Sequence, residues 1–487
     1  MEQIRFVDTT IRDGHQSLWA MNMRTSHMLT VLPYLDSAGF ESIEFFAKGA
    51  GLKKLLRHLH ENPWDWIKGG VAVAKKTPLR WHGPIKGRTM SGYVPIEIGE
   101  LLIKKAVDLG IVYTRVGDIW NDFNELEDEL VRFDRLGMTA VVNIIYSISP
   151  RHTDEYFVAK TREAAALRPY RLCFKDVGGL LTPDRIRTLM PKLIEAAPGV
   201  KWEFHGHCNN GFGPLNALEF VKLGITVIHT AIPPLANANS QPSIYNVAEN
   251  LRALGFEPEI HEEVLLPATE YLTRVAKQEK FQIGIPYEYD ERLYNHQVPG
   301  GMISNLIYQL SLVGMEHRIG EVLEEIPQVR AELGHPIMVT PLSQIVGSQA
   351  AINVIVGERY GQVSDATIEY ALGRHGSEAL AAMDQNTRSK ILDRPRAKEL
   401  AALEPWEPTL GELRQKYGKG ISDEDLILRS VVGDDALDVV GRASNTEPVR
   451  MAHRPVSKVV RDLVSRDGHR SFSWDGDGFS VTIVKSS

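Results

Sequence analysis

The sequence has little cysteine and no long apolar run. Only two cysteines occur among 487 residues, Cys173 and Cys208. This excludes a disulfide framework and favours a reducing compartment. No stretch approaches 18 uninterrupted apolar residues, which argues against a membrane segment, and the opening residues do not resemble a signal peptide. We therefore expect a soluble, cytoplasmic protein.

Basic residues are slightly fewer than acidic ones. The chain carries 55 Lys+Arg against 62 Asp+Glu, a formal net charge of −7, and no run of five Lys or Arg residues occurs. Nucleic-acid-binding domains usually carry a basic excess, so nucleic acid is not expected as a partner. The composition, with 43% hydrophobic and 24% charged residues, is that of a globular protein, and the length predicts two or three domains.

Short β-rich apolar segments recur at nearly regular intervals in the first half of the chain. There are eight, at 4–10, 40–46, 77–81, 111–117, 139–146, 171–177, 201–207 and 226–232. Segments of helical periodicity lie between them, and Thr182 followed by Pro183 is a typical helix start. Eight β/α units in about 250 residues predict a TIM (β/α)8 barrel, which we assign to residues 1–290. A doubly wound sheet also alternates strands and helices, but it usually has fewer strands.

The second half is different, because helical periodicity dominates after residue 255. The helical stretches are 305–314, 319–333, 343–360, 364–373 and 409–417, and Thr409 with Glu412 forms a capping-box pattern. We expect a mostly helical C-terminal domain at 291–445. The tail, 446–487, has a helical pattern at 455–464 and a hairpin pattern at 471–484.

Three polar residues at strand ends predict a metal site. His205 and His207 close the seventh segment, and residues two apart on a strand point to the same side, so both imidazoles can bind one divalent ion. Asp13 follows the first segment, which lies only two strands away around an eight-stranded ring. A carboxylate with two imidazoles suits Zn²⁺, Mn²⁺ or Co²⁺. Taken alone, such histidines are more often structural, and Asp13 could equally cap its loop beside Arg12.

Lys175 ends the sixth segment after a run of apolar residues, which is an unusual place for a lysine. One interpretation is an ion pair with Asp176. The other is an amine of lowered pKa that acts as a base, forms a Schiff base or reacts with CO₂ to give a carbamate. A carbamate would convert the cation into an oxygen ligand. Together with Asp13, it would balance the charge of a divalent ion.

Several motifs in one order complete the pattern. The longest are Asp8-Thr9-Thr10-Ile11-Arg12-Asp13-Gly14-His15-Gln16-Ser17, Phe174-Lys175-Asp176 with Gly179-Leu180-Leu181-Thr182-Pro183, and His205-x-His207. Shorter ones are Arg57 with Glu61-Asn62-Pro63-Trp64, Ser240-Gln241-Pro242-Ser243, Pro299-Gly300-Gly301-Met302 with Asn305-Leu306, and Val339-Thr340-Pro341-x-Ser343. Together they resemble the carboxyltransferase domain of biotin-dependent carboxylases. That family includes pyruvate carboxylase, the α subunit of oxaloacetate decarboxylase and the central subunit of transcarboxylase.

The resemblance implies a metal centre and an acceptor site. Asp13, His205, His207 and Lys175, the last as an N-carboxylated lysine, would bind the divalent ion. The metal would stabilise the negative charge that develops on the acceptor's carbonyl oxygen when a methyl proton leaves. Gln16 would contact the carbonyl region, and Arg57 would bind the carboxylate, for which arginine is the natural bidentate partner. Without the resemblance, Arg57 would be interpreted as a helix-surface residue.

The same resemblance implies how biotin is handled. Arg12 and Ser343 would bind biotin, and Thr340 would carry a proton between biotin and acceptor, which makes Thr340, Arg12 and Lys175 the candidate catalytic residues. Alone, Thr340 before Pro341 predicts only a helix cap. The family further implies that the helical domain forms a funnel and that the protein is a homodimer.

The expected function is that of one subunit of a split enzyme. The chain lacks an Ala-Met-Lys-Met type biotinylation sequence and a Gly-rich ATP-grasp signature. Biotin carboxylase and the biotin carrier would therefore be separate chains, and the tail either docks one of them or packs on its own second domain. The subunit would move CO₂ between carboxybiotin and a small 2-oxo acid such as pyruvate or oxaloacetate, or an altered acceptor.

The chain departs from the family pattern mainly where the acceptor would lie. The departures are Phe46-Ala47-Lys48-Gly49-Ala50, Gly83-Pro84-Ile85-Lys86, Gly117, Cys208-Asn209-Asn210 and His229-Thr230-Ala231. We therefore expect an acceptor other than pyruvate, or pyruvate held differently. The alternatives are a metal-dependent aldolase, lyase or acyl-CoA synthase on a similar barrel, and a non-enzymatic scaffold, which predicts no tight metal.

Overall fold

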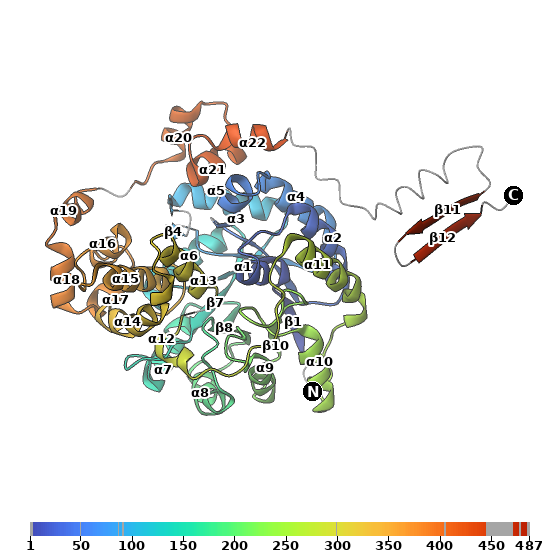
Figure 1. The fold of residues 1–487 in the computed structure, drawn as a ribbon, viewed down its shortest axis with the longest axis horizontal. Helices are drawn as coiled ribbons and strands as arrows, with labels where there is room; N and C mark the ends of the chain where they lie inside the picture. Colours follow the sequence, from blue (N-terminus) through green and yellow to red (C-terminus); the bar gives the residue numbers. More distant parts are fainter. Residues whose placement is uncertain are drawn as a thin grey trace.

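The first half of the chain folds into a closed barrel of eight parallel strands. The computed structural model describes residues 3–48, 50–85, 87–89, 92–298, 300–403, 406–444, 471–476 and 479–484. The strands pair in the order β1-β10-β9-β8-β7-β6-β3-β2, and Figure 1 shows helices arranged around them. Their bounds are β1 (Arg5–Asp8), β2 (Ser42–Ala47), β3 (Leu79–His82), β6 (Tyr113–Val116), β7 (Thr139–Ile145), β8 (Arg171–Asp176), β9 (Trp202–Gly206) and β10 (Val227–Thr230). Each overlaps one of the eight expected segments, so the predicted TIM barrel is confirmed.

Helices cover the outside of the barrel, which buries β2 and β8 along their whole length. These helices are α2 (Thr25–Ser37), α3 (Ala50–Arg57), α4 (Pro63–Val73), α5 (Ile96–Asp108), α6 (Phe123–Arg135), α7 (Asp154–Ala166), α8 (Pro183–Ala196), α9 (Gly213–Lys222), α10 (Ile244–Ala253) and α11 (Leu266–Glu279), whereas the short α1 (His15–Leu18) packs on the turn that follows β1. The Thr182 side chain accepts a hydrogen bond from the Arg185 amide and Pro183 is the first residue of α8, as expected. A short hairpin, β4 (Gly87–Thr89) and β5 (Gly92–Val94), lies between β3 and α5.

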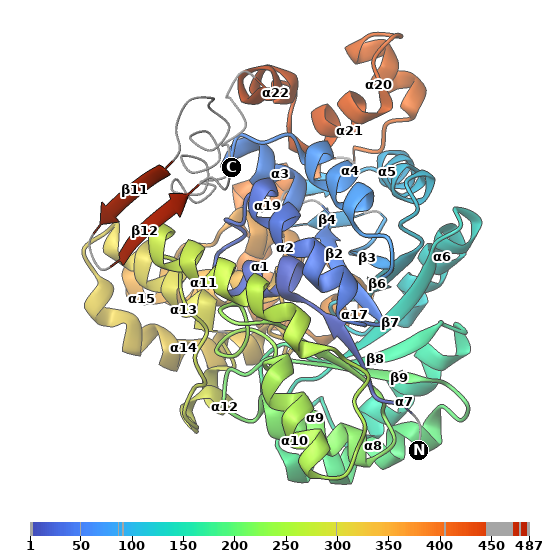
Figure 2. The same ribbon diagram turned by 90° about the vertical axis from the view of Figure 1, so that its right-hand side faces the viewer.

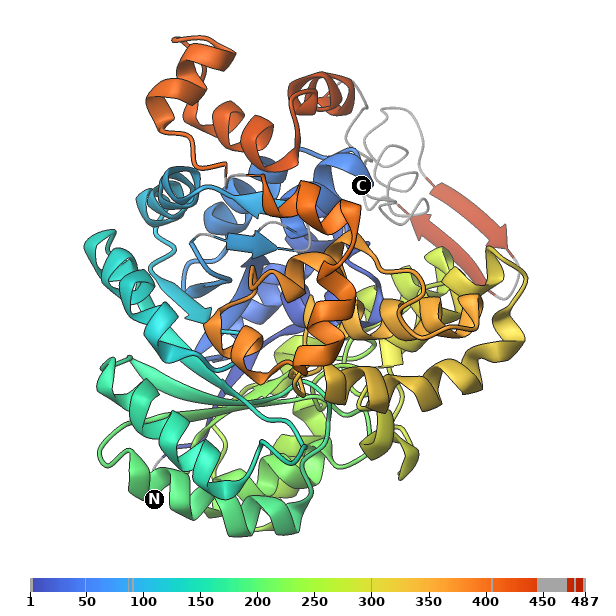
Figure 3. The ribbon, with the colours of Figure 1, turned by 90° about the vertical axis from the view of Figure 1, so that its left-hand side faces the viewer.

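The helices that follow form a block of their own (Figure 3), and all but the first contribute buried side chains to a second hydrophobic cluster. They are α12 (Arg292–His296), whose Leu293 belongs to the barrel cluster, α13 (Gly300–Ser311), α14 (Ile319–Glu332), α15 (Leu342–Val356), α16 (Asp365–Ala371), α17 (Ser377–Ala382), α18 (Gln385–Leu392) and α19 (Pro395–Ala401). The cluster also includes Trp120, which follows β6. Arg330 of α14 donates hydrogen bonds to the Ser147 hydroxyl and the Ile148 carbonyl, each at 2.9 Å, after β7. This helical block, 292–401, is therefore attached at the carboxyl ends of barrel strands.

The next three helices return to the barrel (Figure 2). They are α20 (Leu410–Tyr417), α21 (Asp423–Val432) and α22 (Ala436–Ser444). Their buried residues, including Leu413 and Leu426, belong to the barrel's hydrophobic cluster, and α21 contacts α3 and α5. The region expected as one helical domain, 291–445, thus contributes to two clusters. Thr409 and Glu412 form the expected capping box of α20.

The tail contains a hairpin where the sequence suggests one. β11 (Ser471–Gly476) and β12 (Phe479–Val484) pair antiparallel. The helix expected at 455–464 lies outside the described residues, as does Pro299 of the Pro-Gly-Gly motif. Within the described part of the chain, no helix combines the length and the apolar character needed to cross a bilayer.

We expect the Leu426→Ala substitution to destabilise the barrel, because Leu426 is fully buried in the barrel cluster. Large-to-small changes of this kind cost about 2–5 kcal/mol. Urea unfolding followed by tryptophan fluorescence measures the loss. The matched control is Leu403→Ala, whose side chain is 59% exposed, and it should leave the transition within about 0.5 kcal/mol. Equal midpoints for both variants would contradict the packing of α21 on the barrel.

Candidate functional site

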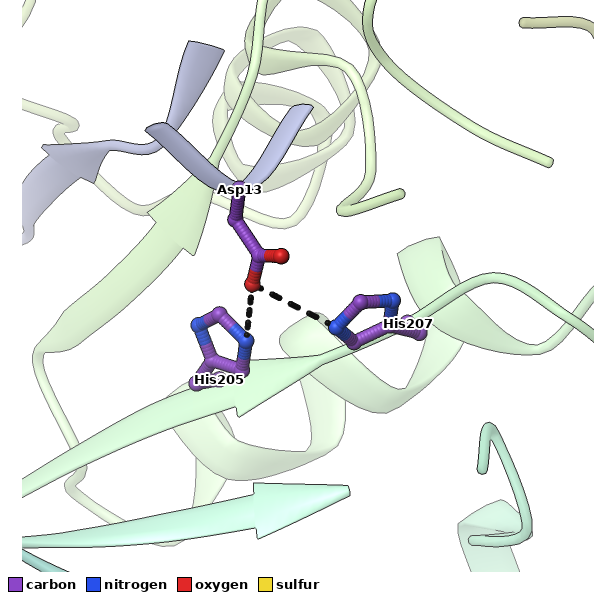
Figure 4. Close-up of side chains that lie close together, drawn as sticks. All are labelled: Asp13, His205 and His207. Atoms are coloured by element: carbon purple, nitrogen blue, oxygen red, sulfur yellow. Dashed lines mark ion pairs between the residues drawn. The ribbon is translucent and has the colours of Figure 1, made fainter. Parts of the chain in front are cut away.

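Asp13, His205 and His207 come together at one end of the barrel (Figure 4). Asp13 lies in a π-helical turn, Thr10–Gly14, just after β1; His205 is in β9 and His207 follows it. Asp13 Oδ2 is 2.9 Å from His205 Nε2 and 3.4 Å from His207 Nε2. All three side chains are buried. The ligand atoms of the predicted trio lie within 4.8 Å of one another, a spacing that one divalent ion can bridge.

Hydrogen bonds behind the two imidazoles orient them. His207 Nδ1 is 2.5 Å from the Asn239 carbonyl oxygen, so Nδ1–H donates and Nε2 keeps its lone pair. His205 Nδ1 is 3.0 Å from His229 Nδ1, and His229 Nε2 is 3.1 Å from a Glu203 carboxylate oxygen. If His205 Nδ1–H donates to His229 Nδ1 and His229 Nε2–H donates to Glu203, the Nε2 lone pair of His205 is also free. Partners of this kind behind metal-binding histidines fix the ring and its tautomer.

Charges in the site favour cation binding. Burial and the nearby Arg115 guanidinium lower the pKa of His205 well below its usual value, so this imidazole is neutral. Burial raises the pKa of Asp13, but Arg12 and His207 outweigh that effect and hold it well below its usual value. One carboxylate and two imidazole nitrogens are a donor set that suits Zn²⁺, Mn²⁺ or Co²⁺. The residues present therefore fit a divalent metal ion.

Lys175 is the neighbour of His205 in the register of β8 and β9. Its side chain is buried, and burial together with Arg115 lowers its pKa to about 8. Among the residues that the structure describes, no ion pair joins Lys175 to Asp176, the expected alternative; Asp176 instead accepts hydrogen bonds from the amides of Leu180 and Leu181 at 3.0 and 2.8 Å. A lowered pKa increases the share of uncharged amine, which is the form that reacts with CO₂.

A buried carboxylate, Glu44, ties the site to the barrel wall. Glu44 accepts hydrogen bonds from Arg12 Nε at 2.8 Å and from Arg115 Nε at 2.6 Å. Arg12 also donates to Asp13 Oδ2 at 3.1 Å, and Arg115 to Asn143 at 3.0 Å. The sequence singled out Arg12 but gave no signal for Glu44, which lies within an apolar strand pattern.

Gln241 is a second residue without an expected role in the site. Its Nε2 atom lies 3.2 Å from Asp13 Oδ2, 3.3 Å from His205 Nε2 and 3.1 Å from His207 Nε2. Its Oε1 atom lies 2.7 Å from Thr9 Oγ1. The Ser-Gln-Pro-Ser motif pointed to this loop, but only the fold shows that the amide reaches the metal-binding trio.

Arg57 has partners away from this cluster. Its Nη1 atom donates to Asp435 at 2.6 Å, and Nη2 donates to the Val432 carbonyl at 3.1 Å. These partners hold the guanidinium at the junction of α3 with α21 and α22. The structure therefore gives Arg57 a role in docking these helices.

The other expected site residues lie on separate elements. Gln16 is partly buried in α1, directly after the turn that contains Asp13. Thr340 is partly buried, and Ser343 is buried in the first turn of α15. Within the described part of the chain, no hydrogen bond or ion pair joins Gln16, Thr340 or Ser343 to the metal-binding trio.

Three of the segments that depart from the family pattern make close contacts with neighbouring residues. A Cβ atom at Gly117 would lie 2.7 Å from Asn143 Cβ, so glycine makes room for Asn143. Lys48 is buried and donates to the Ile85 carbonyl, while the Ile85 amide donates to Glu129. The loops after β2 and β3 are thereby tied together.

A small, partly open cavity lies beside Arg12. Its lining combines two cationic side chains, Arg12 and Lys54, with His15 and apolar or aromatic residues such as Phe46 and Trp66. Arg12, which also donates to Asp13, links this cavity to the trio, whose own side chains do not line it. The cavity offers a small anionic ligand both charge and apolar contact.

Comparisons with known proteins identify relatives of the whole chain. Residues 293–463 match the family model of a conserved carboxylase domain. The chain is 31% identical over 488 residues to a pyruvate carboxylase subunit of Methanocaldococcus jannaschii, covering 99% of this chain and 84% of the relative. It is 30% identical over 447 residues to the 2-oxoglutarate carboxylase large subunit of Hydrogenobacter thermophilus, covering 90% and 68%.

A solved structure shares the fold. The carboxyl transferase domain of Rhizobium etli pyruvate carboxylase matches with a TM-score of 0.81 and 22% identity, covering 100% of this chain and 85% of that one. The extent and identity of the M. jannaschii match decide the family. The chain belongs to the carboxyltransferase family of biotin-dependent carboxylases and is an enzyme of that kind.

Proposed function

We propose that the protein is the carboxyltransferase subunit of a split biotin-dependent carboxylase. It moves CO₂ between carboxybiotin on a separate carrier and a small 2-oxo acid. The observation that carries this proposal is the buried trio of Asp13, His205 and His207, with Lys175 beside it in register. The relatives' names favour this function over the aldolase, lyase or acyl-CoA synthase alternative.

The metal centre consists of Asp13, His205, His207 and N-carboxylated Lys175 in this proposal. Zn²⁺, Mn²⁺ and Co²⁺ all suit the donor set. A bound ion supplies Lewis-acid stabilisation of the negative charge on the acceptor's carbonyl oxygen. Support comes from the lowered pKa of Lys175, about 8, and from its register with His205.

The chain's other residues bind the two reactants and move one proton. Gln16 orients the acceptor's carbonyl region, while Arg12 and Ser343 hold biotin. The Thr340 hydroxyl accepts the proton from the acceptor carbon and donates its own proton to the biotin nitrogen. In the same exchange the N–C bond of carboxybiotin breaks and a C–C bond to the acceptor forms, so atoms and charges balance.

The acceptor is a 2-oxo acid other than pyruvate, or pyruvate bound by different cations. The relatives are named for pyruvate and for 2-oxoglutarate, which share a carboxylate next to a carbonyl group. Arg57, the expected carboxylate partner, is paired with Asp435. The cavity beside Arg12 and Lys54 offers an alternative place for an anionic group. The altered loops around Lys48 and Gly117 support a changed acceptor site.

The proposed partners are a biotin carrier and a biotin carboxylase subunit, with two copies of this chain forming a homodimer. The M. jannaschii relative is named as one subunit of its enzyme, which supports an assembly from several chains. A cytoplasmic location is supported by Cys173 and Cys208, which are both buried and unpaired.

Removing ligands from the metal centre should deplete the bound ion. We expect Lys175→Ala and His207→Ala each to lower metal content at least about tenfold after dialysis, since even partners behind metal ligands typically contribute 10–100-fold to affinity. Elemental analysis measures the ion, and native mass spectrometry detects the extra carboxyl group on Lys175. Wild-type metal content in both variants would rule out this ligand set.

The Thr340→Ala substitution should abolish the proton transfer but not metal binding. Positioned acid–base groups contribute about 10²–10⁴-fold to rate, and we expect a loss of that size in kcat for carboxyl transfer from a carboxylated carrier. Thr340→Ser, which keeps the hydroxyl, is the control and should retain most of the activity. An active Thr340→Ala enzyme would remove Thr340 from the mechanism.

A panel of acceptors tests the substrate assignment. Steady-state carboxyl transfer should be measured with pyruvate, 2-oxobutyrate, oxaloacetate and 2-oxoglutarate. We expect an acceptor other than pyruvate to have the highest kcat/KM in the wild type. The Lys54→Met variant should lower kcat/KM for the dicarboxylic acids more than for the monocarboxylic ones, because it removes a cation from the cavity beside Arg12. Pyruvate clearly outperforming every other compound would contradict the altered acceptor.

A further inference from the structure

The amide group of Gln241 lies beside the metal-binding cage, the space enclosed by the ligand atoms of Asp13, His205 and His207. With metal–ligand distances of about 2.0–2.2 Å, two ligands are about 3.0 Å apart at a right angle and about 3.4 Å apart at a tetrahedral angle. The terminal Nε2 position of Gln241 lies 3.1–3.3 Å from the ligand atoms of Asp13, His205 and His207. The Asp13 oxygen lies 2.9 and 3.4 Å from the two imidazole nitrogens. The spacing of this fourth atom is therefore that of a fourth ligand.

The hydrogen bonds on the other side of the amide decide which atom should face the cage. Thr9 Oγ1 lies 2.9 Å from the Thr230 carbonyl oxygen and 2.7 Å from Gln241 Oε1. One hydroxyl hydrogen cannot be donated to two such acceptors, so one of these contacts lacks a donor. A half-turn of the amide about its last bond removes the conflict, because its two N–H groups then face Thr9 Oγ1 and Ser240 Oγ, the latter 3.3 Å away.

The same half-turn places the amide oxygen beside the metal ligands. The two ends of a glutamine amide are nearly equal in shape and are distinguished by their hydrogen bonds. With the nitrogen inward, the amide donates to Asp13 and the imidazoles, an arrangement suited to a cage without a cation. With the oxygen inward, a fourth lone pair points at the cage, which only a cation can satisfy. Gln241 is fully buried, so neither end can bind solvent instead.

We propose that Gln241 Oε1 is a ligand of the divalent metal ion, in addition to Asp13, His205 and His207. The inference rests on the metal centre of the proposed function. Thr9 and Ser240 are positioning residues, since they accept the N–H groups of the turned amide. The donor set then contains an uncharged oxygen, so Gln241 adds no negative charge to that of Asp13 and N-carboxylated Lys175.

The test uses the full-length protein loaded with Co²⁺. Gln241→Ala should lower Co²⁺ affinity, measured by competition with a chelator, at least about tenfold and change the visible absorption of the bound ion. Gln241→Glu should retain tight Co²⁺, because it keeps an oxygen at the same position. If Gln241 instead serves as an N–H donor to Asp13, the added carboxylate repels Asp13 and the Glu variant loses the metal along with the Ala variant.

The matched control is Gln349→Ala, which removes a fully buried glutamine of α15 whose amide bonds Asn353 and Gln362. It should leave the Co²⁺ spectrum and affinity unchanged. A wild-type protein that binds no Co²⁺ would overturn the metal centre and Gln241 together. A wild-type spectrum and affinity in Gln241→Ala, with the wild type fully loaded, would overturn the role of Gln241 alone.

Discussion

The Glu44 carboxylate, buried among two guanidinium groups, is the interaction on which the site depends. A carboxylate without exposure to water needs counter-charges close by, and Arg12 and Arg115 supply them from different parts of the barrel. Arg12 continues to Asp13, and Arg115 lies 3.5 Å from His205 Nδ1. Loss of Glu44 would leave the buried Arg115 guanidinium without its carboxylate partner. Asp13 and His205, two of the proposed metal ligands, thus both contact arginines of one buried charge network.

The barrel and the helical block meet where this network ends. Trp120 and Arg330 attach the block to the segments after β6 and β7, at the edge of the barrel where the metal-binding trio lies. Parallel strands of a closed barrel all present their carboxyl ends at that edge, so one face collects the polar side chains and the covering helices. The fold therefore places the candidate site at the carboxyl ends of the strands, while the opposite end of the barrel contributes to stability.

The strands and the trio could be predicted from the sequence, because strand periodicity and order around the ring determine which residues converge. The partners of Gln241, Glu44 and Arg57 could not. Gln241 reaches the trio through the backbone path of the loop after β10, which no local pattern encodes. Glu44 sits in an apolar strand, and only closure of the barrel brings two arginines to it. Arg57 meets Asp435, which lies 378 residues later in the turn between α21 and α22, so its motif match said nothing of this pair.

The return of α20–α22 to the barrel has a mechanical consequence. The chain enters the helical block from the last barrel helix and leaves it into segments packed on α3 and α5. The helical block, 292–401, is connected at both ends to segments packed on the barrel, so it has little freedom to rotate as a lid. A group delivered by a separate carrier would then have to reach a site whose helical cover stays in place.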